Sequence, residues 1–278
     1  MKNYYYLLAS CLFFSFQLYA QTFEWAASFS GSGYDHSSSI TLDQNGNVYS
    51  TGYFFNTVDF DPDTSVFNLT SSSSSDIYIS KLDTNGQLVW AKSFTGSGTF
   101  KRGQGITIDK NGNIYTTGRF SGKVDFNPST APADTFFHNV TGSSRAAFIS
   151  KLDSNGNFIW AKIFTGNGTV EGNSIAVDDY GNVFTTGSFA GTVDFNPAQV
   201  TFNMSSAGAS DMFVSKLDAS GNFEWAKKIS GTSIDDGKAI AVDQLGNVCI
   251  VADVLSQVVD VDPSLNVVNL STNGGFDV

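Results

Sequence analysis

A tandem repeat constrains the fold of this chain more than any other feature. The chain has 278 residues, and three short phrases recur along it in the same order. Self-similarity at a fixed period is the sequence signature of architectures in which one supersecondary unit is stacked on the next. The tryptophan phrase contains Trp25, Trp90, Trp160 and Trp225, at steps of 65, 70 and 65 residues; a second phrase starts at Leu42, Ile108, Val177 and Val242; a third starts at Ser80, Ser150 and Ser215.

Each repeated unit has the pattern of four β-strands. Alternating apolar residues at Ile40 and Leu42 predict the first strand, because alternation is the period of a half-buried strand. The segment from Asp43 to Gly46 predicts a tight turn, since aspartate bonds to nearby backbone amides and glycine accepts a positive φ. The second strand is expected at 47–52, the third at 77–80 after a longer connection, and the fourth at 88–94 after another Asp-x-x-Gly turn.

The tandem arrangement of these units predicts the architecture. The fourth strand is apolar at consecutive positions from Leu88 to Ala91, which is typical of a sheet covered on both faces. Sheets of four strands that repeat and cover one another form a β-propeller, whereas solenoid repeats are usually shorter and sandwiches rarely repeat so strictly. The predicted fold is an all-β propeller of four-stranded antiparallel blades with about four tandem repeats of 65–70 residues, at approximately 22–86, 87–156, 157–221 and 222–278, the last incomplete.

The first residues predict export. Residues 1–20 combine a positive charge at Lys2, an apolar stretch and a small residue at Ala20, which is the pattern of a cleavable signal peptide. The segment from Leu8 to Cys11 resembles a lipoprotein box, but apolar residues continue beyond it, so secretion is favoured over lipidation. The mature protein is therefore expected to comprise residues 21–278 and to lie outside the cell or on its surface.

The last repeat stops early. Asp277 and Val278 align with Asp76 and Ile77, at the start of a third strand, and no fourth strand follows. We therefore expect the chain to be an N-terminal fragment of a longer protein, with an open or partial ring here and about six to eight blades in the complete one. The remainder of the same longer chain is then an expected partner.

The charge balance limits the other partners. The formal net charge is −11 at pH 7, which repels phosphate backbones and anionic headgroups. Neither nucleic acid nor, after signal cleavage, a membrane is expected as a partner. Cys11 lies in the leader, so the mature chain can form no internal disulfide, and Cys249 in the apolar run 247–251 is predicted to be a buried small hydrophobic residue.

An acidic phrase follows the second strand of every unit. Alternation places its two oxygen-bearing side chains on one face, at a spacing that hard cations use. Two oxygens fall short of the roughly six to eight that calcium takes, and Asp or Asn before proline also starts turns. We predict no cofactor and no metal ligands, with calcium at these phrases as the alternative. The copies are Val58-Asp59-Phe60-Asp61-Pro62, Val124-Asp125-Phe126-Asn127-Pro128, Val193-Asp194-Phe195-Asn196-Pro197 and Val259-Asp260-Val261-Asp262-Pro263.

Four sequons stand at one repeat position. In a eukaryotic secreted protein they would indicate N-glycans. In a bacterial protein, the interpretation we favour is an alternating strand or loop edge with the apolar residue packed and the polar residues exposed. The sequons are Asn68-Leu69-Thr70, Asn139-Val140-Thr141, Asn203-Met204-Ser205 and Asn269-Leu270-Ser271.

No catalytic constellation is visible, so no catalytic or cofactor-binding residue is predicted. The two histidines, His36 and His138, occupy non-equivalent repeat positions, which disfavours a triad or a histidine-rich metal site. The run from Ser71 to Ser75 is a polar loop without the Gly-x-Ser-x-Gly pattern of a nucleophile elbow. Glycosidase carboxylates need no fixed sequence spacing, so that chemistry stays open as an alternative.

These phrases resemble SBBP repeats, the seven-bladed β-propeller repeats of exported bacterial proteins. The resemblance rests on the phrase Trp25-Ala-Ala-Ser-Phe-Ser-Gly and on the pattern Ile40-x-x-Asp43-x-x-Gly46-Asn47-Val48-Tyr49-x-Thr51-Gly52, and it spans 22–278. The leader and the Val-Asp-Phe-Asp-Pro phrase are similar to secreted proteins of the Bacteroidota, which often use type IX secretion. The phrase from Lys81 to Trp90 is also similar to quinoprotein-like propellers, which implies that Trp90, Trp160, Trp225 and Trp25 dock neighbouring blades, without implying a redox cofactor.

The expected function is a non-catalytic extracellular scaffold for binding or display, acting in adhesion or at the cell surface. Its partner is an unknown protein or glycan, which exposed aromatic residues such as Tyr34, Phe55 and Phe100 could contact. The alternative is a propeller enzyme acting on extracellular polysaccharide at the central opening of the ring. An enzyme would place a non-repeated acidic cluster there, whereas a scaffold would place only repeat-equivalent residues.

Overall fold

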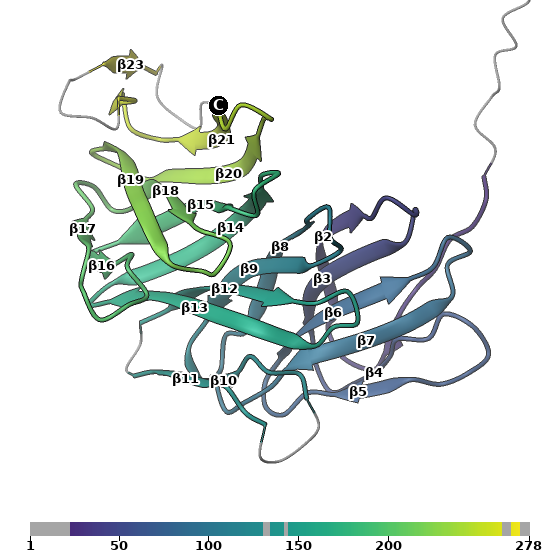
Figure 1. Ribbon diagram of the computed structural model, residues 1–278. Helices are drawn as coiled ribbons and strands as arrows, with labels where there is room; N and C mark the ends of the chain where they lie inside the picture. The colour runs from purple at the N-terminus through teal and green to yellow at the C-terminus, as the bar shows by residue number, and fades with distance from the viewer. Residues whose placement is uncertain (1–22, 130–133, 142–143, 263–267, 273–278) are drawn as a thin grey trace, which may run out of the picture.

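The computed structural model describes residues 23–129, 134–141, 144–262 and 268–272. Every regular element in these ranges is a β-strand that pairs antiparallel with its neighbours, and no helix is present in them (Figure 1). A helix with the length and apolar character needed to span a bilayer is accordingly absent from the described ranges. The all-β, antiparallel part of the prediction is confirmed. The predicted signal peptide at 1–20, Cys11 and the closing residues Asp277 and Val278 lie outside the described residues.

Long strands form one sheet for each repeat, and the sheets follow one another from purple to yellow in Figure 1. Within a sheet the four strands pair in the order in which they occur along the chain. The first sheet contains β2 (His36–Leu42), β3 (Val48–Phe54), β6 (Asp76–Leu82) and β7 (Leu88–Phe94); the second contains β8 (Arg102–Ile108), β9 (Ile114–Phe120), β12 (Ala146–Leu152) and β13 (Phe158–Gly166); the third contains β14 (Thr169–Val177), β15 (Val183–Ala190), β18 (Asp211–Leu217) and β19 (Phe223–Gly231); the fourth contains β20 (Asp235–Val242) and β21 (Val248–Val254).

A short hairpin lies between the second and third strands of every unit, where the sequence predicted only a longer connection. The first hairpin pairs with the N-terminal segment, and each later one pairs with the end of the fourth strand of the preceding unit or with the residue just after it, so the second and third sheets extend to six strands. The hairpins are β4 (Thr57–Asp59) with β5 (Asn68–Thr70), β10 (Gly122–Asp125) with β11 (Phe137–Val140), β16 (Thr192–Asp194) with β17 (Asn203–Ser205), and β22 (Val258–Asp260) with β23 (Asn269–Ser271); their partners across the boundary are Ser30 in β1 (Ser30–Gly31) for Asp59, Thr95 for Asp125, Thr165 for Asp194 and Ser230 for Asp260.

The Asp-x-x-Gly turns form as predicted. The Oδ1 atom of Asp43 accepts hydrogen bonds from the amides of Asn45 and Asn47, both at 2.9 Å. The amide of Gly46 donates to the Asp43 carbonyl at 3.0 Å, and Gly46 has φ +82°, where a Cβ would be strained. The same arrangement recurs at the turns that begin with Asp83, Asp109, Asp153, Asp178, Asp218 and Asp243.

Trp25, Trp90 and Trp160 each contact the turn before the fourth strand of the following unit, which confirms for these three the docking role that the resemblance implied; the role of Trp225 stays a prediction. The indole Nε1 of Trp25 donates to the Thr84 carbonyl at 2.9 Å, and that of Trp160 donates to the Ala219 carbonyl at 3.4 Å. Both carbonyls lie in the turn before the fourth strand of the following unit. The ring of Trp90 packs edge-on against Tyr49 in its own sheet, with centroids 6.2 Å apart.

Substituting Gly86 should test this docking contact. A Cβ at Gly86 would lie 2.8 Å from Cε3 of Trp25, and φ is +82°. Gly246 has φ +83° at the equivalent turn position, but nothing lies within 4 Å of its Cβ, so Gly246→Ala is the matched control. Gly86→Ala is expected to lower the free energy of unfolding by about 1 kcal/mol or more beyond the control, because it also displaces an aromatic ring. Urea denaturation measures both, and equal losses would mean that the indole contact contributes nothing.

Hydrophobic side chains fill the space between successive sheets. One core joins Ile77, Ile79 and Phe94 of the first sheet to Phe120 and Phe148 of the second, and another core joins the second sheet to the third. The aromatic and branched residues at alternate strand positions therefore stabilise the boundaries between units more than any single sheet.

Two predictions about burial are wrong. The fourth strand is not covered on both faces, since Val89 is 50 % exposed and Ile159 is 44 % exposed. Cys249 is exposed instead of buried. Its repeat equivalents Tyr49 and Tyr115 are buried under the following unit, but no described residues cover the corresponding face of β21.

Candidate functional site

The acidic phrases act as turn-forming segments in the structure. Oδ1 of Asp59 accepts the amide of Asp61 at 3.0 Å and that of Phe67 at 2.8 Å, so one carboxylate oxygen closes the hairpin loop. The interpretation that this phrase starts a turn is confirmed. The residue between the two oxygen-bearing side chains is fully buried in three of the units: Phe60, Phe126 and Phe195. The same pair of amide bonds is present at Asp125, Asp194 and Asp260.

The sequon asparagines lie on the outer strands of the hairpins, as an alternating edge strand predicts. The four asparagines are exposed, and the apolar residues that follow them are at least half-buried in the first three units. Leu270 in the last unit is 58 % exposed, which departs from the pattern.

The structure does not bring the two histidines together. His36 lies on β2 and stacks on Tyr53 with ring centroids 5.2 Å apart. His138 lies on β11 between Phe126 and Phe136, where burial lowers the pKa of its imidazole and the charge of Lys162 acts in the same direction. Within the described ranges, no three His, Cys, Asp or Glu side chains gather as metal ligands would.

The serine run is a structural loop that contacts the next unit. The hydroxyls of Ser72, Ser73 and Ser74 donate to backbone carbonyls between residues 96 and 99, at 2.7 to 2.9 Å. Beside them, the ammonium of Lys101 is fully buried and forms an ion pair with Asp76. Burial raises the pKa of Asp76 and lowers that of Lys101, and the ion pair opposes both shifts.

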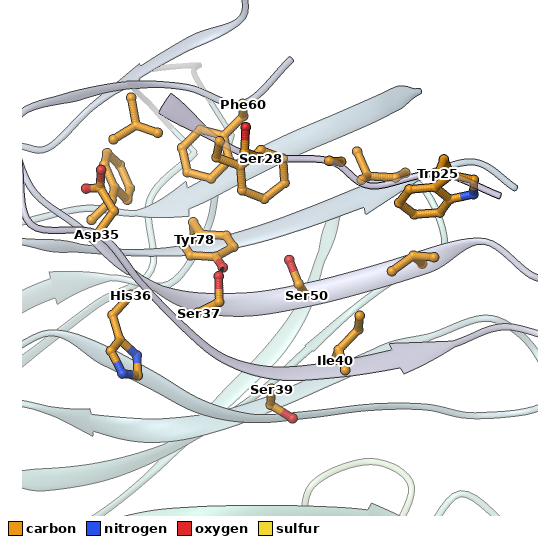
Figure 2. A pocket seen from close by; sticks show the side chains of 16 residues that line it. Trp25, Ser28, Asp35, His36, Ser37, Ser39, Ile40, Ser50, Phe60 and Tyr78 are labelled. Atoms are coloured by element: carbon orange, nitrogen blue, oxygen red, sulfur yellow. Dashed lines mark hydrogen bonds between the residues drawn. The ribbon is translucent and has the colours of Figure 1, made fainter. Parts of the chain in front are cut away.

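A cavity of about 500 Å³ lies between the N-terminal segment and the first sheet (Figure 2). Phe60 and Tyr78 line it, with Trp25 toward one end and Asp35 toward the other. The Tyr78 hydroxyl is 2.7 Å from the Ser37 hydroxyl, and burial raises the pKa of Tyr78, so its phenol stays protonated at neutral pH. These groups can receive an apolar or aromatic group, and Asp35 and His36 line the same cavity.

All three arginines of the chain lie in the second unit, near the start of its first strand. Arg102 on β8 and Arg119 on β9 are directly opposite each other, and Arg145 lies at the start of the third strand of the same sheet. Glu171 on β14 forms ion pairs with Arg119 and, at 2.8 Å, with Arg145.

Aromatic rings surround this arginine cluster (Arg102, Arg119 and Arg145). The guanidinium of Arg102 lies 4.7 Å from the centroid of Tyr53, and that of Arg145 lies 5.2 Å from the centroid of Phe100. Phe100 is 46 % exposed, as expected for a contact residue, whereas Phe55 is only half-exposed and Tyr34 is 76 % exposed.

The cluster has a local excess of positive charge in a chain of net charge −11. Arg119 and Arg145 share the single carboxylate of Glu171, and Arg102 forms no ion pair with any carboxylate of the described residues. Like charges directly opposite each other on neighbouring strands destabilise a sheet. A guanidinium binds a carboxylate or sulfate through paired hydrogen bonds, so the arrangement can bind an anionic group.

A row of polar side chains continues along the first strands of the second, third and fourth sheets. Asn173 accepts from the side chain of Gln104 at 2.9 Å and donates to Asp236 at 2.7 Å. Lys238 forms ion pairs with Asp236 at 2.6 Å and with Asp253 at 3.4 Å. The carboxylates of this row therefore have a cationic partner.

Sequence reasoning missed the arginine cluster because it looked for residues that recur. One position near the start of the first strand differs between units: His36, Arg102, Glu171 and Asp236 occupy equivalent places. The available signal was this loss of repetition on strands that otherwise repeat closely.

Comparisons with known proteins agree with the repeats. A family model described as SBBP, beta-propeller repeat, matches residues 24–53, 89–119 and 159–188. Each matched segment begins next to a tryptophan (Trp25, Trp90 or Trp160) and continues through the first two strands of the next sheet. The copy that begins near Trp225 lies outside the matched segments.

Two curated proteins are similar over part of the chain. An uncharacterized WD repeat-containing protein, L264, of Acanthamoeba polyphaga mimivirus is 32 % identical over 197 residues, which cover 63 % of this chain and 14 % of that protein. The regulatory protein FlaEY of Caulobacter vibrioides is 26 % identical over 152 residues, which cover 55 % of this chain and 15 % of that protein. The chain thus spans about one seventh of the length of these relatives.

A solved structure of a protein of unknown function from Bacteroides caccae aligns with 70 % of this chain and 82 % of its own, at 9 % identity and a TM-score of 0.25. The assignment of the repeats rests on the matched family model and on the antiparallel sheets that contain the matched segments. Three segments of the chain therefore match the SBBP beta-propeller repeat.

Proposed function

We propose that this protein is a non-catalytic, extracellular β-propeller scaffold that binds an acidic glycan through its arginine cluster. In this proposal each four-stranded sheet is one blade, and the inner strands line the centre of the arc. The observation that carries it is that Arg119 and Arg145 pair with one glutamate while Arg102, directly opposite Arg119, has no described carboxylate partner.

The surroundings of the cluster favour a sugar acid over a simple ion. Phe100 places an exposed aromatic ring next to the guanidinium of Arg145, whereas Tyr53 is covered by His36 and Arg102. Aromatic faces pack against the apolar faces of sugar rings, while guanidinium groups pair with carboxylates.

The inner-strand carboxylates support binding over hydrolysis. Glu171 is paired with Arg119 and Arg145, and Asp236 and Asp253 both pair with Lys238. A glycosidase needs one carboxyl group that stays protonated and a second that is ionised, across a sugar-sized gap. Carboxylates held by cations are poor proton donors, which makes the alternative of a polysaccharide-cleaving enzyme less favoured.

Binding to polygalacturonate, with dextran as the neutral comparison, tests the proposal on the chain secreted with its own leader. Arg102→Gln with Arg145→Gln is expected to weaken polygalacturonate binding at least about tenfold, because each lost charge-assisted hydrogen bond contributes about 1.5–3 kcal/mol. Lys110→Gln with Lys227→Gln removes the same charge from exposed positions elsewhere and should leave the affinity nearly unchanged. Equal weakening in both double variants would mean that binding depends on the net charge of the protein and not on the arginine cluster.

Release of new reducing ends from either polysaccharide would overturn the non-catalytic part of the proposal. Retention of the chain inside the cell, or a mature N-terminus other than one close to Gln21, would overturn the extracellular part. Undiminished polygalacturonate binding in the arginine variant would remove the cluster as the site.

A further inference from the structure

Neighbouring units meet at one repeat position through a pair of buried side chains. One member begins the third strand of a unit, and the other directly precedes or begins the first strand of the next unit. Backbone bonds establish the equivalence: the Val170 amide donates to the Arg145 carbonyl at 3.1 Å, and the Asp235 amide donates to the Ser210 carbonyl at 3.0 Å. The three pairs are Asp76 with Lys101, Ala146 with Val170, and Asp211 with Asp235, and all six residues are 0 % exposed.

The first pair contains its own cation. The Lys101 ammonium is surrounded by oxygen atoms only: the carboxylate of Asp76, the hydroxyls of Ser72 and Ser73, and the carbonyl of Gly96. Oxygen ligands of these kinds are also those that hard metal cations take. The second pair, Ala146 with Val170, avoids charge altogether.

The third pair has two acids and no buried cation. Oδ2 of Asp211 accepts the Ala207 amide at 2.9 Å and lies 3.7 Å from the ammonium of Lys228, which is 36 % exposed. Oδ1 of Asp211 is buried and makes no hydrogen bond, although the carboxylate is completely inaccessible to solvent. Oδ2 of Asp235 accepts the Ser256 hydroxyl at 2.8 Å.

Leaving two buried carboxylates side by side is costly. Burial raises the pKa of Asp211, the neighbouring amides and Lys228 oppose that shift, and the charge of Asp235 adds to it. An unpaired charge in the interior is normally neutralised by a partner, a bound ion or a proton. Because Asp211 Oδ1 is buried and accepts no hydrogen bond, we expect an ion or a proton at this boundary.

We propose that a calcium ion binds between Asp211 and Asp235, at the position that the Lys101 ammonium takes between the first two units. Asp211 Oδ1 and the Asp235 carboxylate supply two negative charges, which match a divalent cation. The Ser256 hydroxyl lies beside Asp235, and Gly231 occupies the place of Gly96, with its Cα so close that a Cβ would lie 2.9 Å from Asp235 Oδ2.

Calcium fits this site better than magnesium does. The two carboxylates and the hydroxyl come from three different segments, and water would complete the shell. Calcium accepts such irregular shells of about six to eight oxygens, whereas magnesium demands near-octahedral geometry and gives up its water reluctantly. The site is separate from the acidic phrases, whose first aspartates are already bonded to loop amides.

Thermal unfolding of the chelator-treated mature chain with added calcium chloride tests the proposal. At a calcium concentration one hundred times its Kd, Tm is expected to rise by roughly 5–10 °C, and magnesium chloride should have a smaller effect. Asp211→Asn and Asp235→Asn should each abolish the rise. Terbium luminescence at the same site gives a second readout that does not depend on stability.

The chain itself supplies the controls. Asp211→Ala with Asp235→Val copies the Ala146–Val170 pair, and Asp235→Lys copies the Asp76–Lys101 pair; both variants should fold without calcium and show no calcium-dependent rise in Tm. Asp59→Asn alters an acidic phrase and should keep the rise. A parental Tm that calcium does not change overturns the proposal, as does a rise that survives in the Ala/Val variant. If Tm rises on lowering the pH from 7 to 5 but not with calcium, a shared proton occupies the boundary instead.

Discussion

Asp76→Ala is expected to lower the free energy of unfolding by about 3–5 kcal/mol, because it leaves the buried ammonium of Lys101 without its counter-ion. The loss should be largely recovered in Asp76→Ala with Lys101→Val, which copies the Ala146–Val170 pair at the next boundary. The hydroxyls of Ser72 and Ser73 keep their carbonyl acceptors in that double variant, but the Ser72 amide loses Asp76 Oδ2, which accepts its hydrogen bond at 2.8 Å, so the recovery should be incomplete.

Urea denaturation of the parental chain, both single variants and the double variant gives the complete thermodynamic cycle. Asp235→Val alone is not a control for this cycle, because Asp235 is paired with another acid, Asp211, and not with a lysine. A double variant that is no more stable than Asp76→Ala would mean that the surrounding residues cannot pack around an apolar pair, and it would contradict the equivalence of the two boundaries.

Phe126→Ala is expected to cost about 3–5 kcal/mol, the range found when a buried phenylalanine is truncated. Phe126 is 0 % exposed, and its ring centroid lies 5.1 to 5.3 Å from those of Phe94, Phe120 and Phe148, so it joins the first and second sheets. Chemical denaturation measures the loss. Phe137→Ala is the matched control on the same hairpin, because that ring is 46 % exposed, and it should cost less than about 1 kcal/mol.

Losses of similar size in the two phenylalanine variants would contradict the role of Phe126 as the central packing residue. Phe126→Leu should retain much of the stability, since it keeps an apolar side chain in the same cavity. The last unit carries Val261 at this position, so the hairpin tolerates a smaller residue where fewer rings converge.

Local chemistry made the turns and strands of this protein predictable. The Asp43 carboxylate and the positive φ of Gly46 act within a few residues, and the fourth strand of the first sheet has the predicted bounds of Leu88–Phe94. The acidic phrase was harder to interpret. Its carboxylates suggested cation ligands, whereas the buried residue is Phe60, which lies between them. Alternation along a strand does not say which of its two faces meets the core.

Features that depend on distant segments were not predictable in the same way. Cys249 lies on a strand as apolar as those of Tyr49 and Tyr115, and only the presence of a covering unit distinguishes a buried from an exposed face. The arginine cluster joins Arg102, Arg119 and Arg145 with Glu171 from the next sheet, across 26 or more residues for each ion pair. An alignment of the repeats shows the residues that the units share, so residues that occur in only one unit, such as these, do not appear in the common pattern.

The hairpins that bridge successive sheets have a consequence for synthesis on the ribosome. The end of the fourth strand finds this backbone partner only when the hairpin of the following unit has emerged, as Thr165 of β13 does with Asp194 and Ser230 of β19 with Asp260. Assembly is then vectorial, with each nascent unit sealing the one before it. A chain interrupted between units would display an unsealed strand end, a surface that pairs readily with other chains.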